Sequence, residues 1–261
     1  MSRIQDTPEE REIELDRVGI AGLRYPLRVP LRGGGDVRAD ATVDLTVRLG
    51  QEERATHMSR FVAALEASRG EVLAPAGVER LLEGLRTSLG STASHCEISY
   101  VHYVEKRAPE TGAASLLACD VLLVGSLDAG GFDQLLSVRV PVLSVCPCSM
   151  ESSGGVSHSQ RGHVTVAVRT QGRVWVEDLI EIVEASASAP LFPLLTSRDE
   201  GTLVQDAHER PVFVEDLARN VAERLDSDVR VLWYRVDARN QDSVHAHDAC
   251  ASVARTPRDL S

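Results

Sequence analysis

The amino-acid sequence predicts an α+β fold in which antiparallel sheets carry their helices on one face. Segments that alternate apolar and polar residues are typical of half-buried strands. Segments with apolar residues at i, i+3, i+4 and i+7 are typical of amphipathic helices. Both halves of the chain show these segments in the same order. Strands come first, then two helices, then two further strands. This repeat predicts two tandem modules of the ββααββ type.

The first half begins with residues 1–36, which we expect to form an extended arm with weak strand character. The first module then covers 37–130, with an alternating strand at 41–49 and further strands at about 95–106 and 117–126. Two helices lie between them, and their apolar stripes are Met58, Phe61, Val62 and Leu65 and then Val78, Leu81, Leu82 and Leu85.

The second module is expected at 131–261, with strands at about 133–145, 162–170, 229–237 and 243–253. Its helices are expected at about 176–186 and 212–225, and their stripes are Val176, Leu179, Ile180 and Val183 and then Val214, Leu217, Ala218 and Val221. Such a sheet leaves its edge strands open, and joining the sheets of several copies into a barrel removes the edges. We therefore predict barrels in an oligomer, with sites at subunit interfaces.

Composition limits the partners and the compartment. The net charge is −11, which argues against a nucleic-acid surface, and no apolar run approaches the length of a membrane helix. An odd number of cysteines without an N-terminal apolar segment predicts a reducing, cytoplasmic environment. In that setting Cys96, Cys119 and Cys250 are expected to be small buried residues.

Thiol, imidazole and guanidinium groups follow the strand expected to end near residue 145. Cys146, Cys148, His158, Arg161 and His163 lie within eighteen residues. Thiolate and imidazole ligands suit Zn²⁺ or Fe²⁺ better than Mg²⁺. Cys-x-Cys is not the spacing of a structural zinc knuckle, and Pro147 favours a turn here. The segment therefore predicts a metal or nucleophile site.

Several separated motifs resemble, in the right order, those of the type IB GTP cyclohydrolase I family. They are Gln5–Arg11, Arg17–Pro26, Thr56–Phe61, Cys146-Pro-Cys148-Ser, His158-x-Gln-Arg161 and Val174–Pro193. The resemblance runs almost end to end. It implies the tunnelling fold, bimodular subunits and a homotetramer, in agreement with the doubled order of strands and helices.

The resemblance implies a metal-dependent hydrolase that opens the imidazole ring of GTP and releases C8 as formate. The product is 7,8-dihydroneopterin triphosphate, and the reaction is the first step of tetrahydrofolate biosynthesis. The family's metal ligands match Cys146, His158 and Glu200. One divalent metal per active site, Zn²⁺, Mn²⁺ or Fe²⁺, would activate water there, and no organic cofactor is implied.

The resemblance assigns further roles. His245 matches a proton-transfer position, and alternation on the expected strand places His247 on the same face. Asp242 precedes it where the family commonly has Glu, so that its shorter side chain needs a backbone shift to reach the same proton. Cys148 is expected beside the metal ligands, as a proton donor, a hydrogen-bond partner of an intermediate or one half of a reversible disulfide with Cys146.

For the substrate, Glu215 matches the family's purine anchor, because a carboxylate accepts both N1–H and N2–H₂ of guanine. The chain has a single lysine, Lys106, so arginines and histidines must bind the triphosphate. The candidates are Arg60, Arg161 and His163, and Arg24 is a further candidate.

The sequence departs from the family's usual pattern at Met150, Gly155–Ser157, Ser159 and Asp242, which affects substrate and rate more than metal binding. Two alternatives therefore stay open beside the GTP-opening enzyme. One is a variant cyclohydrolase with an altered nucleotide substrate or a cyclic phosphate product. The other is a non-catalytic metal- or pterin-binding paralogue. An oxidoreductase acting on a deazapurine nitrile on the same fold is disfavoured by the metal-ligand set.

Overall fold

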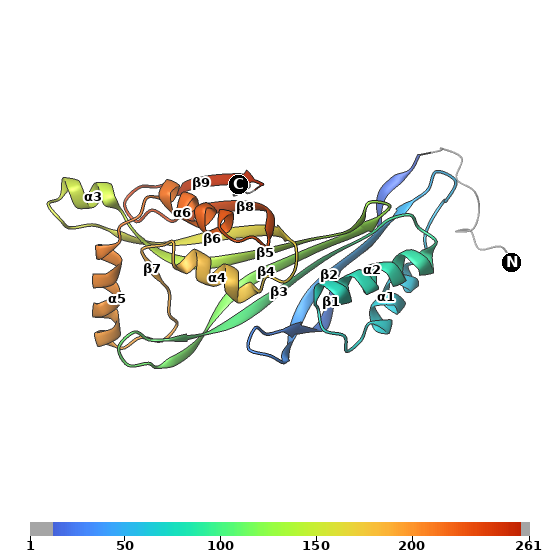
Figure 1. The fold of residues 1–261 in the computed structure, drawn as a ribbon, viewed down its shortest axis with the longest axis horizontal. Helices are drawn as coiled ribbons and strands as arrows, with labels where there is room; N and C mark the ends of the chain where they lie inside the picture. The colour runs from blue at the N-terminus through green and yellow to red at the C-terminus, as the bar shows by residue number, and fades with distance from the viewer. Residues whose placement is uncertain (1–12, 257–261) are drawn as a thin grey trace. The chain divides into compact units, whose positions relative to one another are not determined.

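The structure is a computed structural model that describes residues 13–256 (Figure 1). Within this range the chain forms an antiparallel sheet of nine strands together with six helices, in the strand order β1-β2-β3-β4-β5-β6-β8-β9, with β7 paired to β5. The predicted α+β class is confirmed. The motif at Gln5–Arg11 lies outside the described residues, as do the last five positions of the expected second module. Among the described helices, none combines the length and apolar character that a membrane crossing requires.

The chain divides into two compact units, and the first runs to residue 101 and includes 122–135. It contains β1 (Leu15–Pro30), β2 (Asp36–Leu49), α1 (Met58–Ala67), α2 (Pro75–Leu89) and parts of β3 (Ser94–Arg107), β4 (Ala114–Asp128) and β5 (Gly131–Val145). The expected helices and strands are therefore present. The 130/131 module boundary stays a prediction about the sequence repeat.

Much of the expected N-terminal arm is a full strand, because β1 pairs with β2 over most of its length. Its alternation is interrupted between Ile20 and Leu23, where the register shifts at Gly22, whose φ is 71°. The backbone N–H of Gly22 donates to Asp44 Oδ1 at 2.7 Å. The bulge moves side chains to the other face of the sheet, so the sequence pattern of this strand is weak.

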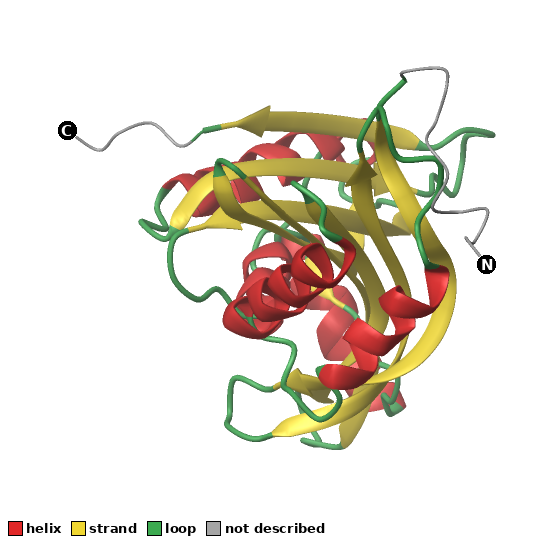
Figure 2. Cartoon of the chain, turned by 90° about the vertical axis from the view of Figure 1, so that its right-hand side faces the viewer, coloured by secondary structure: helices red, strands yellow, loops and turns green. Residues whose placement is uncertain are grey.

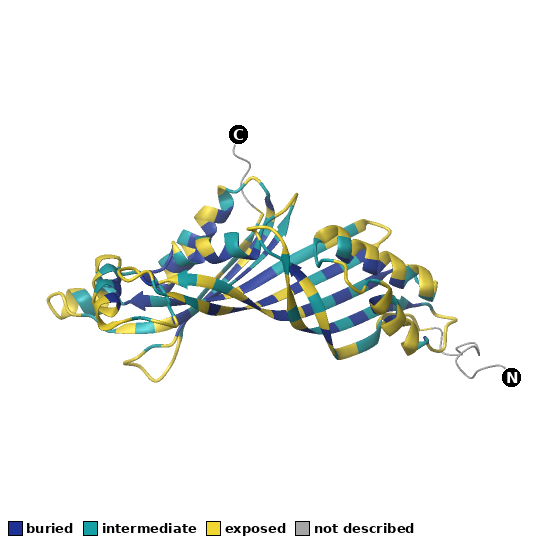
Figure 3. Cartoon of the chain, turned by 90° about the horizontal axis from the view of Figure 1, so that it is seen from below, coloured by how far each residue is buried: buried dark blue, intermediate teal, exposed yellow. Residues whose placement is uncertain are grey.

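The core of the first unit lies between its helices and the sheet (Figures 2 and 3). Phe61 and Leu65 of α1 are buried, but Met58 and Val62 are 44% and 39% exposed, so the buried stripe is narrower than predicted. Helix α2 packs very closely on the sheet at Gly125, where a Cβ would lie 2.9 Å from Val78 Cγ1. All four predicted residues of the α2 stripe are buried.

The second unit comprises 102–121 and the chain from residue 136 onward. Its further elements are α3 (Pro147–Ser152), β6 (Ser159–Thr170), α4 (Val176–Glu184), β7 (Ala189–Pro190), α5 (Ser197–Glu209), α6 (Val214–Asp226), β8 (Val231–Asn240) and β9 (Ala249–Arg255). The predicted stripes of α4 and α6 are buried, and α6 packs on β8 and β9.

A largely buried ion pair joins α4 to β3. Lys106 Nζ donates to both carboxylate oxygens of Glu184 at 2.7 and 2.6 Å, and the two side chains are only 13% and 12% exposed. Its ammonium group also lies 5.2 Å from the centre of the Phe192 ring. The single lysine of the chain therefore has a structural position.

Helix α5 was not predicted, and Asp199 holds it in place. This buried carboxylate accepts hydrogen bonds from the backbone and hydroxyl of Thr196, and from the backbones of Glu110 and Thr111 at 3.0 and 2.9 Å. Burial alone would raise the pKa of Asp199, but the hydrogen bonds outweigh it and lower the pKa below its usual value. One side chain thus caps α5 and fixes the turn between β3 and β4.

We expect Asp199→Asn to lower the melting temperature more at neutral pH than in acid. Because the folded pKa is lowered, the carboxylate contributes stability above its unfolded pKa of about 4, and this contribution is lost as the pH falls. Thermal unfolding at pH 7 and pH 3 measures the effect. A deficit of the variant that does not shrink in acid contradicts this role of the charge.

Candidate metal and substrate site

Cys146 and His158 lie side by side where β5 ends and β6 begins. Cys146 is the N-cap of α3, so the expected turn at Pro147 is a short helix. The backbone N–H of Cys146 donates to the carbonyl of His158 at 3.3 Å. The hydroxyl of Ser157 donates to the carbonyl of Cys146 at 2.7 Å and crosslinks the same loop. Cys146 is partly exposed and Cys148 is exposed, and both are free thiols.

The imidazole of His158 is oriented by a residue from another loop. Its Nδ1 lies 3.0 Å from Ser243 Oγ, a hydrogen bond across 85 positions of sequence. With Nδ1 engaged, Nε2 is the nitrogen left to bind a ligand. Thiolate and imidazole are the ligand types that a borderline-soft divalent metal prefers.

Glu200 stands apart from these two residues. It is exposed in the first turn of α5, whereas His208 in the last turn has its Nε2 3.4 Å from the carbonyl of Ser157. His208 is eight positions after Glu200, which corresponds to about 12 Å along the helix axis. Among residues 13–256 there is no group of three or more His, Cys, Asp and Glu side chains placed to hold one metal ion. Within one chain, Cys146 and His158 are therefore joined by a backbone hydrogen bond, and Glu200 forms no such three-residue group with them.

The strand expected at 243–253 begins only at Ala249, which corrects the prediction for its first six residues. Asp242 Oδ1 accepts hydrogen bonds from the backbones of Val244 and His245, both at 2.7 Å, and these close a turn instead. They lower the pKa of Asp242 to about 2. His245 Nδ1 lies 3.3 Å from the same oxygen, and the rings of His245 and His247 have centroids 5.3 Å apart.

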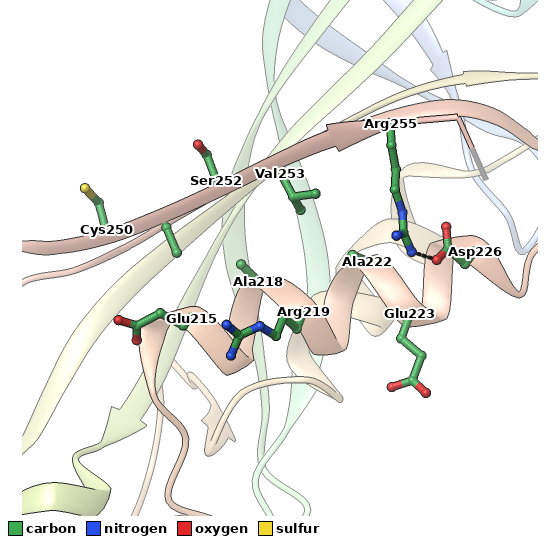
Figure 4. A pocket seen from close by; sticks show the side chains of 11 residues that line it. Glu215, Ala218, Arg219, Ala222, Glu223, Asp226, Cys250, Ser252, Val253 and Arg255 are labelled. Carbon is green, nitrogen blue, oxygen red and sulfur yellow. Dashed lines mark ion pairs between the residues drawn. The ribbon is translucent and has the colours of Figure 1, made fainter. Parts of the chain in front are cut away.

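Glu215 lies at one end of a groove between α6 and β9 (Figure 4). The groove has a volume of about 590 Å³, with apolar residues such as Ala218, Ala222 and Val253 in its wall. Cys250 also lines it and is exposed, contrary to its expected burial. The reason is that β9 is an edge strand of the described sheet, with β8 as its neighbour.

The expected phosphate-binding cations occupy different places. Arg161 and His163 lie on β6, where His163 is opposite Arg239 in register and shares a groove with Arg139. Burial, and then the charge of Arg139, lowers the pKa of His163. Arg60 belongs to the first unit, on α1, and donates to the carbonyl of Ser88 at 3.1 Å. Arg24 forms an ion pair with Asp40.

Two residues near the site were not predicted, Ser243 and His208. Ser243 contacts His158 from the turn between β8 and β9, and His208 contacts Ser157 from the last turn of α5, so both contacts join segments far apart in the sequence. Neither residue belongs to a local pattern that could have indicated these contacts. Helix α5 did have a local signal, since Thr196 and Asp199 form a capping box.

Comparison with known proteins gives a full-length match. Residues 1–251 match the family model described as type I GTP cyclohydrolase folE2. A GTP cyclohydrolase FolE2 of Methylococcus capsulatus is 41% identical, over 98% of this chain and 95% of the relative. A protein of the same name from Paraburkholderia xenovorans is 42% identical, over 99% and 96%.

Solved structures support the fold. A uricase from Arthrobacter globiformis aligns over 94% of both chains with a TM-score of 0.60 and 11% sequence identity. A uricase from Bacillus fastidious aligns over 95% of this chain and 94% of that chain, with a TM-score of 0.55 and 8% identity. At such identity the likeness concerns the fold alone, and it confirms the expected tunnelling fold. Assembly into barrels stays a prediction.

Proposed function

This chain belongs to the type I GTP cyclohydrolase FolE2 family, and from that premise we propose that it hydrolyses GTP at C8 of the purine. The products are formate and 7,8-dihydroneopterin triphosphate, in the first step of tetrahydrofolate biosynthesis. The observation that carries the proposal is identity of about 40% to FolE2 enzymes over nearly the whole chain. Family membership does not favour the paralogue or variant-substrate alternatives. Within the family we assign the chain to type IB.

The residues at the end of β5 fit a metal-dependent hydrolase. We assign Cys146 and His158 as ligands, supported by their adjacency and by the orientation of His158 through Nδ1. We assign Glu200 as the third ligand. A divalent metal held there, Zn²⁺, Mn²⁺ or Fe²⁺, supplies activation of water for attack at C8. No organic cofactor is needed for this chemistry.

Proton transfers accompany ring opening, and His245 is our candidate for them. It is exposed beside Asp242, and its backbone is held by the same carboxylate. His247 lies next to it and is the second imidazole of this loop. Cys148 is exposed as the second residue of α3, where it can hydrogen-bond a reaction intermediate.

For substrate binding we assign Glu215 to the guanine edge and Arg161 to the triphosphate, with His163 as a hydrogen-bond donor. The groove beside Glu215 has an apolar wall suited to a purine face. Because burial and Arg139 lower the pKa of His163, its ring acts at neutral pH as a neutral partner. Arg60 stays a candidate for the triphosphate from the first unit of a subunit.

We further propose a cytoplasmic homotetramer with sites at the subunit interfaces. The open edges of β1 and β9 support this, since pairing them between copies removes both. The separation of Glu200 from His208 along α5 also supports it, because a second subunit can bring its Glu200 to Cys146 and His158. Five free cysteines fit a reducing compartment.

The proposal is tested by incubating protein reconstituted separately with Zn²⁺, Mn²⁺ or Fe²⁺ with GTP. We expect equimolar formate and a pterin that becomes fluorescent after oxidation. Bound metal without formate indicates the non-catalytic paralogue and rejects the proposal. Formate with a cyclic phosphate product indicates the variant cyclohydrolase.

A further inference from the structure

We infer that Asp242 and Ser243 are positioning residues that fix both imidazoles of the site, His158 and His245, through one turn between β8 and β9. The inference rests on the proposed function, since it concerns the same site. It differs from a role for Asp242 in proton transfer. It also adds Ser243, which the ligand and catalytic assignments do not include.

Ser243 orients the proposed metal ligand. Its Oγ is 3.0 Å from His158 Nδ1, whereas His158 is otherwise joined to the loop of Cys146 through backbone groups. A partner on Nδ1 selects the tautomer and the ring direction that leave Nε2 as a ligand. Ser243 therefore acts through His158, without contact with the substrate.

Asp242 orients the other imidazole by building the turn. A single oxygen, Oδ1, meets the backbone N–H groups of Val244 and His245 at 2.7 Å and His245 Nδ1 at 3.3 Å. The carboxylate side chain is 14% exposed, whereas the ring of His245 is 62% exposed. The exposed ring of His245 can thus contact a ligand, while Asp242 fixes its backbone N–H and lies beside its Nδ1.

Side-chain length explains why this position suits aspartate. Asp and Asn side chains accept hydrogen bonds from backbone groups two and three residues on, which produces a tight turn. A Glu side chain is one methylene longer and does not favour this geometry. Ser243 lies inside the turn, so the carboxylate that places His245 also presents the hydroxyl to His158.

Metal affinity tests the role of Ser243 without GTP. We expect Ser243→Ala to weaken Zn²⁺ binding about 10- to 100-fold in competition with a chelator, and to alter the visible spectrum of the Co²⁺ form. Ser243→Thr keeps the hydroxyl and is expected to restore both. Ser252→Ala, an exposed serine on β9, is the matched control. Wild-type affinity and spectrum in Ser243→Ala overturn the inference.

Turnover of two Asp242 variants tests the turn. Asn keeps an acceptor oxygen without the charge, so we expect the kcat of Asp242→Asn to exceed that of Asp242→Ala at least about tenfold. Equal losses in the two variants indicate proton transfer by Asp242 and reject its positioning role. The Zn²⁺ and Co²⁺ readouts need no turnover, so failure of the inference is distinguishable from failure of the proposed GTP hydrolysis.

Discussion

Cys146→Ala is expected to remove bound metal and to lower formate release at least about 1,000-fold, which corresponds to ~4 kcal/mol of transition-state stabilisation. Cys146 belongs to a loop fixed by its backbone hydrogen bond to His158 and by Ser157. Loss of the thiol leaves the imidazole without the proposed soft ligand, while the backbone contacts stay. The measurements are metal content by mass spectrometry and formate release.

Cys250→Ala is the matched control for metal content, because Cys250 is a free, exposed thiol on β9. We expect it to bind metal like the wild type. An active, metal-replete Cys146→Ala protein contradicts the proposed chemistry.

The same variant locates the third ligand. If Glu200 comes from a second subunit, mixing Cys146→Ala with Glu200→Ala chains under refolding conditions produces some interfaces with a complete ligand set. We expect formate release to recover in the mixture, since α5 keeps Glu200 about 12 Å from His208 along its axis. No recovery, with tetramers formed from both chains, assigns all the ligands to one chain.

Glu215→Gln is expected to lower kcat/KM for GTP about 100-fold. An amide offers one acceptor and one donor, so it cannot accept both N1–H and N2–H₂, and a buried donor of guanine is left without a partner. Inosine triphosphate lacks the N2 amine, so the preference of the wild type for GTP over this analogue is expected to shrink in the variant.

Glu223→Gln is the control for this prediction. Glu223 lies two turns further along α6 on the same groove and is also exposed. We expect it to keep the preference for GTP. An unchanged preference in Glu215→Gln means that another residue recognises the purine.

The sequence predicts those parts of the fold whose local pattern coincides with burial. The stripes of α2, α4 and α6 are buried as expected. Helix α5 was missed because only Leu203 and Ala207 supply buried apolar side chains, while a carboxylate, Asp199, anchors it. Strand β1 appeared weak because the bulge at Gly22 interrupts its alternation.

Which candidate site residues are neighbours could be predicted only where they are close in the sequence. Cys146 and His158 belong to one loop, and their adjacency follows from a short segment. The apolar and polar alternation around Val244 indicated a strand, but the Asp242 side chain competes with strand pairing for its backbone. The contact of Ser243 with His158 depends on how distant loops meet, which no local pattern encodes.

Helix α5 is braced at both ends. Asp199 ties its beginning to the turn that contains Glu110 and Thr111, and His208 meets Ser157 near its other end. These contacts restrain both ends of α5 and so fix the position of the proposed ligand Glu200 on it. The β3–β4 turn contains none of the proposed ligands, but substitutions in it are therefore expected to displace α5 through Asp199 and with it Glu200 at the proposed metal site.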